Sequence, residues 1–102
     1  MPRFDVYANP NPRASHARLL DVQSDLVLTS TRWCVPLSMH KPGMPVMSGA
    51  QALLVLEEQS WLLDTPNVLA MPAALLRQPQ GRLTPEDQLR VETALDFMLR
   101  GW

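Results

Sequence analysis

The last part of the chain constrains the fold most, because it carries the one sustained helical pattern in the sequence. Thr84 and Pro85 are typical of a helix start, where a hydroxyl caps the first amides and proline suits the first helical position. Gly101 is a typical stop. Two pairs spaced four apart, Glu86–Arg90 and Asp96–Arg100, are expected to pair along the helix surface. The expected apolar stripe comprises Leu89, Val91, Ala94, Leu95, Met98 and Trp102.

Prolines and polar turns divide the preceding residues into short segments with the period of two that is typical of strands. A first strand is expected at residues 4–7, and a half-buried strand at residues 19–28 with Leu20, Val22, Ser24 and Leu26 on one face. The other face of that second strand is a polar row formed by Asp21, Gln23 and Asp25.

The middle of the chain predicts further strands and one long loop. The expected strands lie at residues 33–36, at 52–56 and 60–63 (a hairpin turning at 57–59), and at 69–76, and residues 38–51 are expected to form the loop. This layout predicts one domain over residues 1–102, mainly β, in which a compact sheet or barrel carries a C-terminal helix.

Composition excludes several classes of protein. With 9 Lys+Arg against 10 Asp+Glu, the net charge of −1 argues against a basic nucleic-acid-binding module. Cys34 is the one cysteine, so an intrachain disulfide or a multi-cysteine zinc site is impossible. The chain has no apolar run of membrane-spanning length and no signal-peptide pattern, so we expect a cytoplasmic protein with no membrane partner.

Candidate catalytic residues are few. His16 and His40 lie in expected loops without ligand spacing, and we expect them to be solvated. Cys34 lies in an apolar strand, which favours a buried structural thiol over a nucleophile. For the Asp21–Asp25 row a structural or interface role is favoured over paired-carboxylate chemistry. We therefore expect neither a catalytic set, a metal nor a cofactor.

Several segments, taken in order, resemble the CcdB family of bacterial toxins over the full chain. They are Phe4-Asp-Val-Tyr7, Asp21-Val-Gln-Ser-Asp25 with Leu26-Val27, Arg32-Trp-Cys-Val-Pro-Leu37, Ser60-Trp61, Thr65, Met71-Pro72 and Phe97-Met-Leu-Arg-Gly-Trp102. The Asp-Val-Gln-Ser-Asp motif is the most specific of these.

The resemblance implies a small SH3-like barrel with a C-terminal helix that forms homodimers and is not an enzyme. Such toxins bind the A subunit of DNA gyrase, trap the cleaved-DNA complex and are neutralised by a CcdA-type antitoxin. The resemblance also implies that the toxin alone makes no direct contact with nucleic acid. The gyrase contacts of the family map here onto Leu26, Val27, Asp96, Met98, Leu99, Arg100, Gly101 and Trp102.

The end of the chain departs from the best-known members, which finish Trp-Gly-Ile where this chain finishes Arg-Gly-Trp. Either Trp102 replaces the missing aromatic from a shifted position, or the chain is a non-toxic binding module with the same fold. A third alternative is an endoribonuclease of the MazF/Kid type, whose barrel is related, but that activity needs a general acid and base beside a basic groove.

Overall fold

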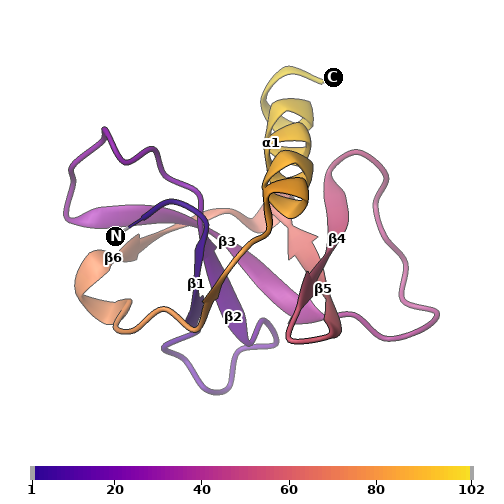
Figure 1. The fold of residues 1–102 in the computed structure, drawn as a ribbon, viewed down its shortest axis with the longest axis horizontal. Coiled ribbons are helices and arrows are strands. Elements are labelled where there is room, and N and C mark those ends of the chain that lie inside the picture. Colours follow the sequence, from indigo (N-terminus) through magenta and orange to yellow (C-terminus); the bar gives the residue numbers. More distant parts are fainter. Residues whose placement is uncertain (1, 102) are drawn as a thin grey trace.

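Seven strands form one antiparallel sheet in the computed structural model, which describes residues 2–101, and one helix follows them (Figure 1). The strands are β1 (Asp5–Ala8), β2 (Arg18–Asp21), β3 (Thr31–Met39), β4 (Gln51–Leu56), β5 (Gln59–Asp64), β6 (Leu69–Pro72) and β7 (Gly81–Arg82). Two short 3-10 turns, η1 (Thr65–Asn67) and η2 (Ala73–Leu75), flank β6, and the helix α1 spans Pro85–Arg100. The expected mainly β fold with a terminal helix is therefore confirmed, as a half-barrel in a single compact domain.

The long strand β3 organises the sheet, whose order is β4-β5-β3-β2-β1-β7 with β6 also paired to β3. Its first half pairs with β6 as far as Cys34↔Leu69, and its last residues pair with β5 from Leu37↔Leu63. Pro36, which has no amide hydrogen, lies where the neighbour on that side changes from β6 to β5. A proline inside a central strand is tolerated because it falls at this change of partner.

Two apolar clusters stabilise the sheet, one on each face. The larger cluster lies under α1 and joins Val91 and Ala94 to buried side chains from β1 to β5. The smaller one comprises Tyr7, Leu19, Cys34 and Leu76, with Met71 packed against it. Both faces of β1 and β3 are thus covered. No helix among residues 2–101 is long and apolar enough to cross a membrane.

The helix has the predicted ends. The Thr84 hydroxyl accepts a hydrogen bond from the Asp87 amide (3.2 Å), and Gly101 adopts φ 85° at the C-cap. The predicted inward stripe was partly wrong, because Leu89 is 66% exposed and Met98 is also exposed, whereas Asp87 is buried. Trp102, the last member of that stripe, lies outside the described residues.

A buried acid explains how the helix is oriented. The Asp87 carboxylate accepts a hydrogen bond from the Val55 amide (3.0 Å), which ties the first turn of α1 to β4. It also pairs with Arg90 (3.4 Å), so the expected Glu86–Arg90 pair is replaced by an i,i+3 pair. Within the described chain, Asp96 and Arg100 form no ion pair either.

Three strand boundaries differ from the prediction. The second strand ends at Asp21 rather than Leu28, and residues 22–30 form a loop. The sixth ends at Pro72, where η2 replaces the expected continuation to Leu76. The third continues past Pro36 to Met39, so the predicted loop shrinks to residues 40–50. The β4–β5 hairpin is confirmed, with a two-residue turn.

Candidate partner-binding surface

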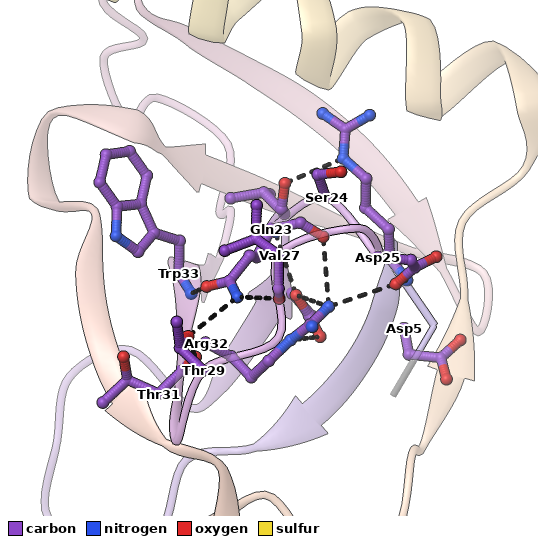
Figure 2. Close-up of polar contacts among 12 residues, drawn as sticks. Asp5, Gln23, Ser24, Asp25, Val27, Thr29, Thr31, Arg32 and Trp33 are labelled. Carbon is purple, nitrogen blue, oxygen red and sulfur yellow. Dashed lines mark hydrogen bonds and ion pairs between the residues drawn. The ribbon is translucent and has the colours of Figure 1, made fainter.

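Asp21 and Gln23 of the Asp-Val-Gln-Ser-Asp motif lie in a buried polar cluster, whereas Ser24 and Asp25 are exposed. Asp21 is fully buried and pairs with Arg32 through two hydrogen bonds, Nε to Oδ2 at 2.8 Å and Nη2 to Oδ1 at 3.1 Å. The same guanidinium donates to the Gln23 carbonyl (3.2 Å) and to Asp25 Oδ1 (3.3 Å), as Figure 2 shows. The prediction that Asp21 and Gln23 face solvent was wrong, because Arg32 on β3 neutralises the acid inside the fold.

Charge pairing also determines the direction in which the pKa of Arg32 is shifted. Burial by itself lowers the pKa of a guanidinium, but the hydrogen bonds and negative charges of Asp21 and Asp25 outweigh it and raise the pKa of Arg32. The Arg32 guanidinium is therefore retained as a cation inside the fold, and its hydrogen bonds to Asp21 fix the end of β2 against β3.

Gln23 uses its whole side chain to hold the loop that follows β2. Its amide nitrogen donates to the Val27 carbonyl (2.8 Å) and to the Thr29 hydroxyl (3.2 Å), while its Oε1 accepts from the Trp33 amide (2.9 Å). Arg3 adds a further link, since its amide donates to Asp25 Oδ1 (2.9 Å). The loop is thus held at Asp25, Val27 and Thr29.

This fixed loop exposes the two apolar residues that were predicted to contact a partner. Leu26 is 92% exposed and Val27 is half-exposed. The expectation that Leu26 faces the core was wrong, because the strand has ended before it. Exposed apolar side chains held by a buried polar cluster are typical of a binding surface rather than of a folding core.

The end of α1 presents a second exposed group. Leu99 is 73% exposed, Met98 is partly exposed, and Asp96 and Arg100 also face solvent. The C-terminal end of α1 is capped by Gly101, which has a left-handed backbone conformation and whose amide donates to the Phe97 carbonyl (2.8 Å). Trp102, the predicted contact that closes the chain, lies outside the described residues.

A shallow hollow of about 220 Å³ adjoins the helix end, and sequence reasoning missed it. It is lined by Arg3, Val22, Trp33, Glu92, Leu95, Asp96 and Leu99, so it includes two of the predicted contacts. One of its lining side chains is Trp33, which is 53% exposed and points away from the polar cluster in Figure 2. The period of two in β3 could have revealed Trp33, since it shares a face with Val35 and Leu37, but not that α1 stops short of covering it.

The residues weighed for catalysis have structural roles. Cys34 is fully buried, and burial, followed by the charge of Asp21, raises the pKa of its thiol to about 12, which confirms a structural cysteine. His40 Nε2 contacts the Met44 carbonyl (3.1 Å). His16 is not simply solvated as expected, because its Nε2 lies 2.9 Å from Asp64 Oδ2. Residues 2–101 contain no group of three side chains suited to hold a metal ion.

Comparison with known proteins also indicates a protein that acts by binding a partner. No curated protein matches the chain. The family model described as CcdB protein, however, matches residues 3–101, which is nearly the whole chain and includes the buried motif, the exposed loop and the helix end. The chain therefore belongs to the CcdB family, whose members are non-enzymatic toxins of type II toxin–antitoxin modules that poison DNA gyrase.

Proposed function

We propose that this chain binds the A subunit of DNA gyrase in the cytoplasm and traps the complex that gyrase forms with cleaved DNA. The contacts would be Leu26 and Val27 on the loop after β2, and Asp96, Met98, Leu99, Arg100, Gly101 and Trp102 at the helix end. Membership of the CcdB family supports the target. What we propose for this chain in particular is the set of residues that contact the gyrase A subunit.

One observation carries the assignment: both regions expose large apolar side chains on rigidly held backbone. Leu26 and Leu99 are among the most exposed leucines of the chain. Their backbones are fixed by Gln23 and by the Gly101 cap. A preorganised apolar surface binds a partner without a large ordering cost, which suits a small toxin that must hold a large enzyme in one state.

The assembly that we propose is a homodimer, neutralised by a CcdA-like antitoxin. Two copies related by a two-fold axis would present two helix ends, as a two-fold symmetric gyrase requires. Family membership supports both partners.

The test is plasmid cleavage by gyrase in the presence of ATP and the purified protein. We expect linear DNA after detergent and protease treatment, and we expect Leu99→Glu to reduce it at least about tenfold, because a buried unpaired charge at an interface costs more than 1.4 kcal/mol. Leu89→Glu is the matched control, since Leu89 is a similarly exposed leucine on α1 outside the proposed contacts. Equal loss in both variants, or in neither, would contradict the assignment.

A truncation tests whether the Arg-Gly-Trp ending, which differs from the Trp-Gly-Ile of the best-known members, contributes to gyrase binding. Removing Arg100, Gly101 and Trp102 should abolish gyrase binding while the thermal unfolding transition of the domain is retained, because these residues follow the last buried position of α1, Ala94. If the full-length protein never induces DNA cleavage by gyrase, at any excess, the result would instead favour a non-toxic binding module. Discrete cuts in a mixed RNA pool would favour the endoribonuclease alternative.

A further inference from the structure

A second hollow, of about 520 Å³, lies at the start of β2 and the end of β3. Three segments line it, with the residues Ser15, His16 and Ala17 before β2, Ser38, Met39, Lys41 and Met44 at and after the end of β3, and Trp61 on β5. None of these eight residues belongs to the proposed gyrase contacts. The volume is typical of a small-molecule site, whereas the hollow of about 220 Å³ beside the helix end is below that range.

The lining of this second hollow includes a buried donor without an acceptor. Trp61 is the one buried residue among the eight (4% exposed), and its indole Nε1 forms no hydrogen bond within residues 2–101. Arg18 holds the ring in place, because its guanidinium lies 4.7 Å from the ring centre and is itself paired with Glu57 (2.9 Å). A buried N–H group without a partner is rare and destabilising, so a ligand oxygen that accepts from it is bound favourably.

The charges around the second hollow favour an anion. Lys41 is exposed and forms no ion pair within residues 2–101. His16 is the other basic residue of the lining, and none of the eight lining residues is acidic. Two acids that pair with this region are already engaged, Asp64 with His16 (2.9 Å) and Glu57 with Arg18 (2.9 Å). The ammonium group of Lys41 therefore remains available to a negatively charged ligand.

The wall that residues 40–44 contribute is held by its own hydrogen bonds. The Met44 amide donates to the Lys41 carbonyl (3.1 Å), and the Lys41 amide donates to Met44 Sδ (3.2 Å). His40 joins this turn to the sheet, because its Nε2 contacts the Met44 carbonyl (3.1 Å) and its amide donates to the Ser60 carbonyl (2.9 Å). A ligand that enters the hollow therefore meets backbone that is already ordered, which lowers the cost of binding.

We propose that this second hollow binds a small aromatic carboxylate. The aromatic ring packs against Met39 and Met44, since thioethers make favourable contacts with the edges of aromatic rings. The carboxylate accepts a hydrogen bond from Trp61 Nε1 and pairs with the Lys41 ammonium, and the Ser38 hydroxyl is a further donor of the lining. This inference does not depend on gyrase binding.

The test is a titration of the isotope-labelled protein with phenylacetate, in which NMR follows the indole N–H signals. The substitutions Trp33→Phe and Trp102→Phe leave Trp61 as the one tryptophan, and they thereby assign its signal. We expect the Trp61 Nε1 proton to move downfield until the site is saturated, because a hydrogen bond to a carboxylate deshields the donated proton. A Trp61 signal that stays in place at every soluble concentration of phenylacetate would overturn the inference.

Matched variants and probes separate the charge from the ring. We expect Lys41→Gln to raise the Kd for phenylacetate about fivefold, whereas Arg77→Gln, which removes an exposed positive charge outside the hollow, leaves the Kd unchanged. Phenethyl alcohol keeps the ring without the charge, and acetate keeps the charge without the ring, so we expect each to bind at least about tenfold more weakly than phenylacetate. Equal Kd values for the two variants, or binding of the alcohol as tight as that of phenylacetate, would contradict an anion site. Thermal unfolding of each variant verifies that the fold is retained.

Discussion

At the residue scale, the buried ion pair of Asp21 and Arg32 ties the end of β2 to β3. The Gln23 side-chain amide donates to the Val27 carbonyl of the following loop and accepts from the Trp33 amide of β3. A motif that is recognisable in the sequence is thus a structural device, and its functional effect is to position the two residues that come directly after it.

Replacing Arg32 should be severe. Arg32→Leu leaves the Asp21 carboxylate buried and uncompensated, and we expect the free energy of unfolding to fall by about 3–5 kcal/mol. Urea denaturation would measure it. Glu57→Gln is the control, because it breaks an exposed pair with Arg18 (2.9 Å) that contributes about 1 kcal/mol or less. Similar losses in the two variants would argue against a dominant role for the buried pair.

At the scale of elements, the hairpin and the helix were predictable because their signals are local. The caps of α1 lie within a few residues of its ends, and β4 and β5 are separated by a short polar turn. The loop before β4 was predicted, but its packing against the helix could not be, because that packing depends on a contact between residues far apart in the sequence. Gly49 (φ 84°) lies so close to the Phe97 ring that an added Cβ would come within 2.8 Å of it.

The β4–β5 turn offers a stabilising substitution. Glu57 (φ 53°) and Glu58 (φ 64°) both adopt left-handed backbone, as a type I′ turn requires, although glycine favours this region far more. We expect Glu58→Gly to raise the free energy of unfolding by about 0.5–1 kcal/mol. Gln59→Gly, one residue later in β5, should lower it by a similar amount. Calorimetric unfolding of the two variants checks the opposite signs.

At the scale of the whole molecule, Asp64 joins segments that are distant in the sequence. It is buried at the end of β5, where Oδ2 accepts from Asn67 (2.7 Å) and contacts His16 (2.9 Å), and Oδ1 accepts from Gln51 (3.0 Å). Burial alone raises the pKa of a carboxyl, but hydrogen bonds from Asn67, Gln51 and His16 outweigh it and lower the pKa of Asp64.

This shift predicts a loss of stability in acid. Because the folded pKa of Asp64 lies below its unfolded value of about 3.9, the stabilisation is complete above that pH and is lost as the pH falls through the folded pKa. Asp64→Asn should be less stable at neutral pH and lose less on acidification, as measured by urea midpoints from about pH 5 to 2. Glu86→Gln, an exposed control, should follow the wild type, and parallel curves for Asp64→Asn would contradict the prediction.

The sequence by itself determined the class of fold, the position of the helix and the family, because capping, strand period and motif order are properties of neighbouring residues. The gyrase contacts remain predictions from that family. Tertiary structure alone decided that Asp21 and Gln23 are buried, that Leu89 faces solvent, and that Trp33 lines a hollow with the helix end. The physical reason is that a polar side chain is buried only where a partner meets it. Arg32 lies eleven residues from Asp21, and Val55 lies thirty-two residues from Asp87.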